Sequence, residues 1–414
     1  MGVGVPLSNP AHPRASTIEP HDCSIVLRRL EGPAATEVYL HCRPSASTTE
    51  PRGQAEAIYR AIVAALEAEG GDFGSVVAET VFLRDLPGSL EFVREVRREV
   101  LKRHSDTHPA PATTEIEQAP LEARACLEVM VQAVLPHAAS ARRVSIESRS
   151  SCPCAECARA QGHLLHVGEE TRLQAAGLCG TGGDAHEQTV AMFAHAERLL
   201  QHAGMAFSDV VRTWIYLRHM ERDYPQLNRA RREFFAARGI QPVPASTGIG
   251  GGMASDAHDL CLGFHAVSSR RPLARSVMTS PTLNEAADYG ADFARGMRVV
   301  EANKVALHVS GTASIDEHGR TAHAGNLEHQ ADRMLRNIDA LLGRQGATFG
   351  NIVSAITYLK HPEDAERLYR KLREAGFEGF PHALVAAEIC RPELLCETEV
   401  LAALPLGTGT IGSA

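Results

Sequence analysis

The sequence lacks the features that would assign it to a membrane or to nucleic acid. No stretch approaches the roughly 18 uninterrupted apolar residues of a membrane-spanning helix. The first residues lack a positive segment followed by a long apolar core, so we expect no signal peptide. Positive charge is not in excess either, since 42 Lys and Arg against 50 Asp and Glu give a net charge of −8. This balance argues against nucleic acid or an anionic membrane as a partner.

The overall composition is that of an ordinary soluble protein. Apolar residues make up 44% of 414 residues, a length that allows two to four domains at about 100–200 residues each. Ten cysteines are unevenly spaced, and without a secretion signal they indicate reduced thiols. We therefore expect a cytoplasmic protein.

An internal repeat organises the chain. Three amphipathic helical patterns, over 54–70, 188–204 and 330–346, each begin at a glutamine and end at a glycine that suits a left-handed cap. In all three, a phenylalanine follows the glutamine at an offset of 19 residues. Unrelated segments would rarely share such spacing, so the sequence predicts one unit written three times.

Each copy continues in the same order. After the phenylalanine come a β-rich strand, a second helix and two closing strands, which gives a β-β-α-β-α-β-β unit. The second helices are expected at about 87–104, 221–238 and 362–375. The fold class is therefore α+β, with repeat 1 over 20–137, a cysteine-containing linker over 138–162, repeat 2 over 163–270 and repeat 3 over 285–405.

This unit, with its Pro-Ala turn and closing-strand acid, resembles the YjgF/Rid family over nearly the whole chain. The resemblance implies a chorismate-mutase-like fold and homotrimers that bind ligands in the clefts between neighbours. Three copies in one chain would then form an intrachain pseudo-trimer. The imine-hydrolysing branch places an arginine after the Pro-Ala turn, where this chain has Thr113, Ser246 and Ala383. Ordinary enamine deamination is therefore not expected.

The closing-strand acid is the first candidate for chemistry. Glu397 follows Leu394, Leu395 and Cys396 and leads into an apolar strand. Burial disfavours a charged carboxylate, so this group should be paired or should hold its proton to high pH, as a general acid does. The alternative is an edge-strand glutamate that faces water.

The other two copies differ at this place. We align Glu397 with Glu128 in the first copy and with Gly263 in the second. Since copy one has no other unusual polar cluster, Glu128 is expected to be structural.

Repeat 3 also resembles the chorismatase family, a branch built on the same unit. Its motifs run over 289–296, 308–316 and 390–397. The resemblance implies that Glu397 protonates the enolpyruvyl group, that Arg295 clamps a carboxylate and that Cys390 helps to select the product. Gly311 together with Cys390 resembles the hydroxybenzoate-forming subgroup.

Three further residues are candidates for substrate binding. Arg212 and Tyr216 alternate on the strand of copy two, and Arg391 adjoins Cys390. Arginine forks bind planar carboxylates, so these side chains would suit an anionic substrate if they face the cleft. The alternative for each arginine is an exposed position.

A cysteine cluster lies between copies one and two. Cys152, Cys154 and Cys157 form a C-x-C-x2-C pattern that can hold a soft metal such as zinc or copper. No second pair follows at standard spacing, so an incidental loop is the alternative.

The leading hypothesis is a chorismatase-type lyase or hydrolase that converts chorismate into pyruvate and a hydroxybenzoate of the 3-hydroxybenzoate type, without a required cofactor. The alternatives are a tandem Rid-like enzyme that uses metal at the cysteine cluster and a non-catalytic protein that binds small carboxylates. The expected partner is a small anionic carboxylate, and the protein is expected to be a monomer or a small homo-oligomer.

Overall fold

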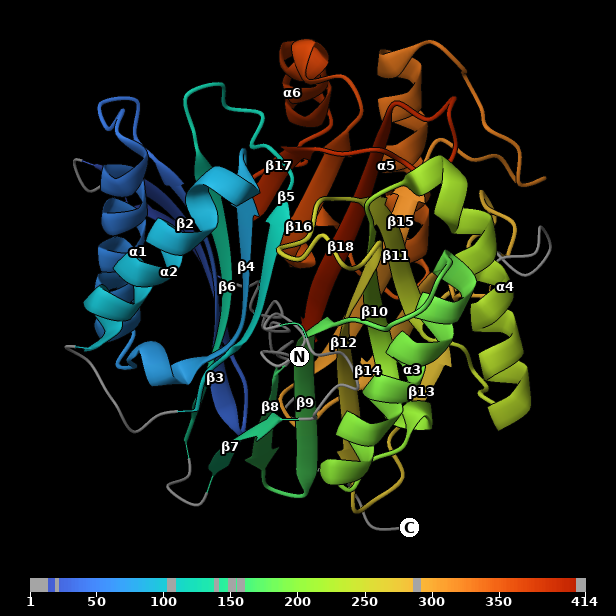
Figure 1. Ribbon diagram of the computed structural model, residues 1–414, viewed down its shortest axis with the longest axis horizontal. Helices are drawn as coiled ribbons and strands as arrows, with labels where there is room; N and C mark the ends of the chain where they lie inside the picture. The colour runs from blue at the N-terminus through green and yellow to red at the C-terminus, as the bar shows by residue number, and fades with distance from the viewer. Residues whose placement is uncertain are drawn as a thin grey trace, which may run out of the picture.

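Three six-stranded sheets, one from each repeat, make up the core of the protein (Figure 1). The structure is a computed structural model that describes residues 14–18, 22–102, 109–137, 141–147, 154, 161–285 and 292–406. In each sheet the strand before the second helix pairs in parallel with the strand after it, and the other neighbours are antiparallel. The α+β class and the threefold repeat are therefore confirmed.

The elements of the three repeats follow one order. Repeat 1 contains β1 (Arg14–Ile18), β2 (Cys23–Glu31), β3 (Ala35–Pro44), α1 (Pro51–Ala68), β4 (Val76–Leu83), α2 (Leu86–Lys102), β5 (Ala112–Glu117) and β6 (Leu127–Pro136). Repeat 2 contains β7 (Arg142–Glu147), β8 (Gln161–Val167), β9 (Glu170–Leu178), α3 (Ala185–His202), β10 (Val210–Leu217), α4 (Met220–Arg238), β11 (Ala245–Gly250) and β12 (Leu260–Ser269). Repeat 3 contains β13 (Arg275–Val277), β14 (Gly296–Val300), β15 (Lys304–Ala313), α5 (Leu327–Gly343), β16 (Ile352–Leu359), α6 (Ala365–Glu374), β17 (His382–Ala386) and β18 (Cys396–Pro405).

Each unit has one more strand than the sequence predicts. β1, β7 and β13 lie at the edges of their sheets, so the unit is β-β-β-α-β-α-β-β. All three lie outside the predicted repeats: β1 precedes residue 20, β7 lies within the predicted linker over 138–162, and β13 lies between predicted repeats 2 and 3. These strands are short, so their apolar pattern is too brief to stand out.

The repeated glutamine has a clear structural role. Gln54, Gln188 and Gln330 are buried at the start of their helices, and each accepts a hydrogen bond from a backbone N–H that leads into the closing strand: Cys126 N, Asp259 N and Leu395 N, at 2.8, 2.9 and 2.8 Å. A buried amide needs such partners. The side chain therefore ties helix to strand in every repeat.

The expected glycine caps are also present. Gly70, Gly204 and Gly346 adopt φ values of 81°, 69° and 74°, in the left-handed region that favours glycine. Among the described residues no helix is both long and apolar enough to cross a membrane.

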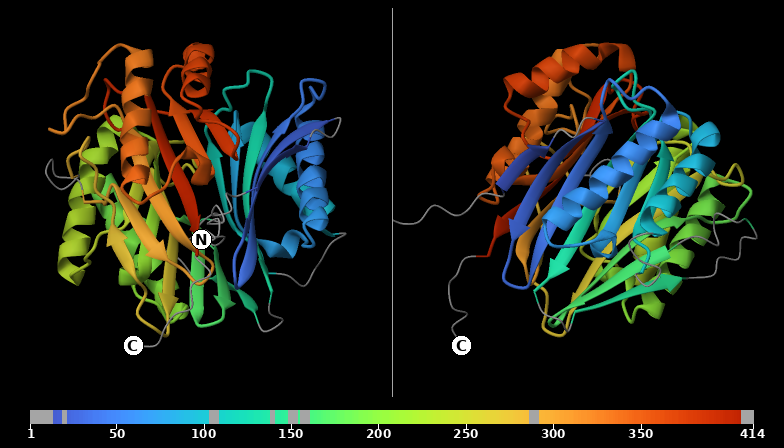
Figure 2. Two further views of the ribbon diagram at one scale, coloured as in Figure 1. Left: turned by 180° about the vertical axis from the view of Figure 1, so that it is seen from behind. Right: turned by 90° about the vertical axis from the view of Figure 1, so that its left-hand side faces the viewer.

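The three units close into a ring with the helices outside (Figures 1 and 2). β5 of repeat 1 packs beside β9 of repeat 2, β11 of repeat 2 beside β15 of repeat 3, and β16 of repeat 3 beside β3 of repeat 1. The inner faces of the three sheets therefore meet along a common axis.

A buried ionic cluster joins the three repeats near this axis. Arg172 Nη1 lies 2.7 Å from Glu37 Oε1, and Lys304 Nζ lies 2.6 Å from Glu37 Oε2. Arg172 and Lys304 also pair with Glu301, and Arg172 pairs with Glu170. Because these groups come from all three units, the cluster fixes how the units sit against one another.

Strand pairing corrects two equivalences drawn from the sequence. Glu128, Cys261 and Glu397 lie opposite Phe82, Tyr216 and Tyr358, so Cys261 rather than Gly263 occupies the position of the closing-strand acid in repeat 2. In the parallel pairs, Thr113 and Ser246 correspond to His382 rather than Ala383. For the acid, the sequence alignment matched the Cys-Leu pair of repeat 1 with that of repeat 2, but Leu127 and Leu262 stand at different places in their sheets, opposite Leu83 and Ile215.

Candidate active site

A cavity of about 300 Å³ lies where repeat 3 meets repeat 2. Repeat 2 contributes α4 and the edge strand β11, and repeat 3 contributes β15, β18 and the loop before β18. Its lining residues are Tyr224, Asn228, Arg231, Ser246, Gly248, Phe293, Arg295, Gly311, Ala313, Ile315, Cys390, Arg391, Leu394 and Glu397. Five of the predicted site residues therefore meet here, namely Glu397, Cys390, Arg295, Gly311 and Arg391.

Glu397 is a buried carboxyl group on β18. It pairs across the sheet with Tyr358 and with Ala313, and only 4% of its surface is exposed. Burial and the nearby charge of Glu399 raise its pKa to about 8, although Arg212 and Arg295 act in the opposite direction. Because this value lies above neutrality, the group holds its proton at pH 7 and can act as an acid.

Gly311 gives this carboxyl group its space. It lies at a bulge in β15, where the register with β18 shifts between Val309 and Thr312. A Cβ atom at position 311 would lie 2.0 Å from Glu397 Oε1, too close for any contact. The backbone N–H of Gly311 donates to Thr247 Oγ1 of repeat 2 at 3.0 Å, so this position also ties the two repeats together.

Two buried arginines flank an aromatic ring in the cavity. The guanidinium groups of Arg231 and Arg295 each lie 5.5 Å from the ring centroid of Phe293. Arg295 Nε donates to Asn284 O at 2.8 Å, and Arg231 Nη2 donates to Asn228 Oδ1 at 2.6 Å. Two oriented cations suit a dianionic ligand.

Sequence reasoning missed Arg231. A usable signal was present, because Leu227, Ala230 and Phe234 form the apolar stripe of α4 and position 231 lies on the same face. An arginine on the buried face of an amphipathic helix requires a partner or a ligand.

Cys390 and Arg391 border the same cavity from the loop before β18. Burial and Glu397 raise the pKa of the Cys390 thiol to about 12, so it is a neutral thiol at pH 7. Tyr224 of α4 acts in the opposite direction through a hydrogen bond to this thiol. Arg391 Nη1 donates to Gly319 O at 2.8 Å, which fixes the side chain at the rim.

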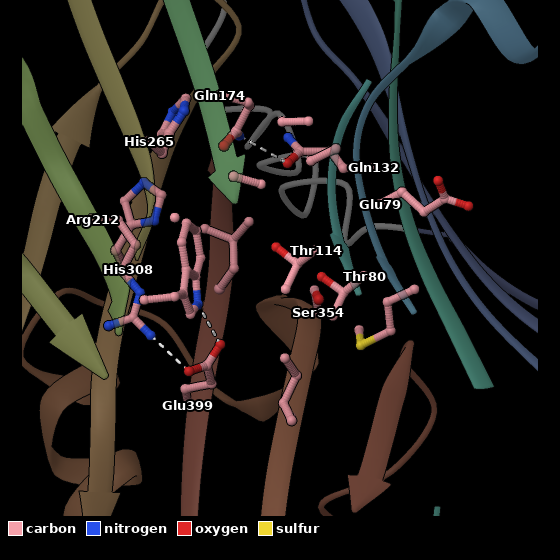
Figure 3. Close-up of a pocket in the computed structure, with 18 of the residues that line it drawn as sticks. Glu79, Thr80, Thr114, Gln132, Gln174, Arg212, His265, His308, Ser354 and Glu399 are labelled. Atoms are coloured by element: carbon pink, nitrogen blue, oxygen red, sulfur yellow. Dashed lines mark hydrogen bonds and ion pairs between the residues drawn. The ribbon is translucent and has the colours of Figure 1, made fainter. Parts of the chain in front are cut away.

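Arg212 and Tyr216 do not line this cavity. They lie on β10 and line a second, axial cavity of about 140 Å³, which all three repeats enclose (Figure 3). Side chains two residues apart on a strand share one face, and here that face is turned toward the axis. The prediction that they bind substrate in the cleft is therefore not supported by their position.

Arg212 instead holds the acid next to Glu397. Its Nη2 donates to Glu399 Oε2 at 2.9 Å, and Trp214 Nε1 donates to Glu399 Oε1 at 2.7 Å (Figure 3). Tyr358 adds a longer bond of 3.3 Å. Arg212 and Trp214 therefore hold Glu399 two residues from Glu397, on the same face of β18.

The predicted cysteine cluster is only partly described. Cys152 and Cys157 lie outside the described residues. Cys154 Sγ lies 3.3 Å from Nε2 of His258, whose Nδ1 faces Gly180 O at 2.9 Å. Cys154 also packs with Cys179 and Cys261.

The Endoribonuclease L-PSP family matches the chain three times, over residues 44–135, 159–255 and 292–404. A RutC family protein of Saccharolobus solfataricus is 31% identical over 98 residues, which cover 23% of this chain and 77% of that protein. The three family matches correspond to the three repeats, so each repeat is a Rid/YjgF-like unit.

Two chorismatases are also similar to the chain. A chorismatase of Streptomyces rapamycinicus is 26% identical over 222 residues, 47% of this chain and 64% of that protein, so the alignment spans less than two thirds of that relative. A crystal structure of a chorismatase superposes with a TM-score of 0.58 at 19% identity and covers 80% of this chain and 93% of that one. The second similarity is one of fold.

Proposed function

The chain belongs to the Endoribonuclease L-PSP family, and from this premise we propose that it is an enzyme of the chorismatase type, which cleaves chorismate into pyruvate and a hydroxybenzoate. The observation that carries the proposal is the buried, protonated carboxyl group of Glu397 in a cavity that also holds two oriented arginines. The similarity to chorismatases supports the same substrate.

The charge of the cavity suits the substrate. Chorismate is a dianion, and Arg231, Arg295 and Arg391 supply three positive charges while Glu397 is neutral. Guanidinium forks bind carboxylates through two parallel hydrogen bonds. Arg295 and Arg231 would hold the two carboxylates, and the ring would lie between them and Glu397.

Glu397 would supply the proton that the vinyl ether needs. Protonation of the terminal methylene carbon gives an oxocarbenium ion, and a carboxylic acid kept neutral by burial can donate this proton at pH 7. The C4 hydroxyl oxygen would then attack C3 as the C3–O bond breaks and pyruvate leaves with the ether oxygen, and the hydroxyl proton would return to Glu397. Opening of the resulting epoxide at its C4–O bond, with loss of the C3 proton and protonation of the oxygen, would leave 3-hydroxybenzoate. The two products together contain all the atoms of chorismate, so no net water or oxidant is consumed.

Cys390 and Gly311 would determine which product forms from the ring of chorismate. The neutral Cys390 thiol lies beside the acid, and Gly311 lets the carboxyl group approach the ring without a side chain between them. We assign this pair to the 3-hydroxybenzoate type of product. Replacing Cys390 with alanine should leave pyruvate release measurable and shift the aromatic product toward a dihydrodiol.

The test is an incubation of the purified full chain with chorismate. Pyruvate and the aromatic product are measured separately, the first by a coupled reductase and the second by chromatography. Equal amounts of pyruvate and hydroxybenzoate support the proposal. Absence of turnover, together with an increase in melting temperature on adding small carboxylates, would instead favour a non-catalytic binding protein.

A metal at the cysteine cluster is a second proposal, favoured by the 3.3 Å contact between Cys154 and His258. The Nδ1 contact with a backbone carbonyl orients Nε2 toward the thiol, as in zinc sites. If zinc or copper binds here, protein purified without chelator should carry it and Cys154→Ser should remove it. Equal metal content in the wild type and Cys154→Ser would show that the cysteine cluster binds no metal and is an ordinary loop.

A further inference from the structure

The axial cavity is lined by two histidines, each with one ring nitrogen that has no hydrogen-bond partner among the described residues. His265 of β12 and His308 of β15 are 5% and 6% exposed, and both line the cavity (Figure 3). Within the described part of the chain, His265 Nδ1 and His308 Nε2 have no hydrogen-bond partner. Buried polar atoms are almost always satisfied, so these two nitrogens call for an occupant of the cavity.

Internal symmetry shows that this arrangement is specific to one junction. His265 lies opposite Arg212 and His308 opposite Leu401 in their sheets, and the same two places at the junction of repeats 1 and 2 hold Gln132 and Gln174. There the two amides bond to each other at 3.4 Å (Figure 3). The glutamine pair satisfies itself, whereas the histidine pair does not.

A third ligand group completes the set. Glu301 lies in the turn between β14 and β15, and its Oε1 lies 3.8 Å from His265 Nε2. The ligand atoms of His265, Glu301 and His308 all lie within 4.8 Å of one another, and no other group among the described residues meets this condition. Two imidazoles and one carboxylate are a common donor set for divalent transition metals.

The surrounding charges also leave room for a cation. Arg172 and Lys304 bind Glu301 through Oε2, at 3.1 and 2.8 Å, so Oε1 is the oxygen turned toward His265. With Glu37 and Glu170 the cluster contains three carboxylates and two cations, which leaves one negative charge uncompensated in a buried place. A buried net charge is costly, and a bound cation offsets it.

We propose that His265, His308 and Glu301 form a binding site for a divalent transition metal of the zinc class, with its remaining coordination position open to the axial cavity. The metal would join repeat 2 to repeat 3 from inside. It is separate from the Glu397 cavity, and it does not depend on the proposed function.

The experiment uses the untagged full chain, since a histidine tag binds the same metals. Metal content is measured after purification without chelator and again after addition of Zn²⁺ or Co²⁺ and removal of the excess. We expect about one His265-dependent metal per chain, and in Cys154→Ser a Co²⁺ spectrum without the charge-transfer band that a thiolate ligand produces. His265→Gln and His308→Gln should each weaken binding by more than the about 10–100-fold that loss of a ligand's hydrogen-bond partner costs.

Two control variants test whether the metal binds at His265 and His308 rather than elsewhere. Gln132→Ala alters the equivalent junction of repeats 1 and 2 and should leave this metal bound, and Cys154→Ser should leave it bound as well. Should either histidine variant fail to fold, X-ray absorption of the wild-type cobalt protein reports nitrogen and oxygen ligands directly. Failure of the wild type to retain added metal overturns the proposal, as does metal that survives both histidine changes or is lost only in Cys154→Ser.

Discussion

Glu397 lies near the acid Glu399 and near two arginines, Arg212 and Arg295. The pH dependence of the proposed reaction follows from their opposing effects on its pKa. Burial and Glu399 raise its pKa to about 8, against the effect of Arg212 and Arg295. Since the acid form is the active one, kcat/KM for chorismate should be flat at neutral pH and fall about tenfold per unit above pH ~8. A pH–rate profile of the free enzyme measures this directly, and a profile that falls near the ordinary carboxyl pKa would contradict it.

The same pKa makes a prediction about stability. Because the folded state holds this proton more tightly than the unfolded chain, folding stability falls as pH rises from the usual carboxyl range to about 8 and is then constant. The total loss is on the order of a few kcal/mol. Glu397→Gln lacks this effect. The free energy of unfolding of the variant, minus that of the wild type, should therefore increase from pH 5 to pH 9. Urea unfolding of both proteins at the two pH values gives the difference, and a constant difference would contradict the assignment.

Gly311 is a second test at the residue scale. An alanine Cβ would clash with Glu397 Oε1, so Gly311→Ala must displace the acid from its present place. Displacement by about 1 Å can cost about 10²-fold in rate, and we expect kcat to fall by roughly that factor with little change in folding. Gly343→Ala is the matched control, because a Cβ there meets nothing within 4 Å. Equal turnover in both variants would show that the acid does not need this space.

At the scale of the element, alternation along the strands decides which of the predicted site residues lie in the Glu397 cavity. Glu397 and Gly311 could be expected in one site because their motifs resemble those of chorismatases, and both line the same cavity. Arg212 and Tyr216 could not be placed from the sequence, because a period of two tells which residues share a face and not which cavity that face borders. The axial cavity exists only once three sheets have closed around it.

β18 couples the two cavities through Glu399. This residue faces Arg212 and Trp214 on one side and raises the pKa of Glu397 on the other. Glu399→Gln removes a negative charge and leaves Arg212 less neutralised, and both changes favour ionised Glu397. The pH above which kcat/KM falls should therefore be lower in Glu399→Gln than in the wild type. If Glu399 only supported the fold, the variant would have a lower kcat/KM at every pH, and the pH at which the fall begins would not change.

At the scale of the molecule, the repeat was readable because its signals are local. The glutamine, the cap glycine and the phenylalanine recur at fixed spacing. In every copy the glutamine makes the same contact, the glycine adopts the same left-handed conformation and the phenylalanine begins a short 3-10 helix. The edge strands and the ionic cluster were not readable, since β1, β7 and β13 are short and the partners of Glu37 lie more than 100 residues away. Ion pairs between residues that lie far apart in the chain produce no recognisable spacing in the sequence.

The ionic cluster predicts where a single substitution should most reduce the stability of the three packed repeats. Glu37 is fully buried, and although burial alone would raise its pKa, Lys304 and Arg172 lower it to about 2. Glu37→Gln would leave both cations without this partner, so we expect a loss of about 3–5 kcal/mol in unfolding free energy. Glu31→Gln, which removes an exposed partner of Arg29, should change stability little. Similar unfolding midpoints for the two variants would show that the cluster does not hold the repeats together.

The central claim is that the carboxyl group of Glu397 donates the proton that starts cleavage of chorismate, and the rate of pyruvate release by Glu397→Gln tests it most directly. The amide keeps the size of the side chain and is easier to bury than a charge, so folding should survive. Glu128→Gln alters the equivalent residue of repeat 1, which hydrogen-bonds His41, and serves as the control. We predict that turnover falls by about 10²–10⁴ in Glu397→Gln and stays near the wild-type value in Glu128→Gln; near wild-type pyruvate release by Glu397→Gln would contradict the account.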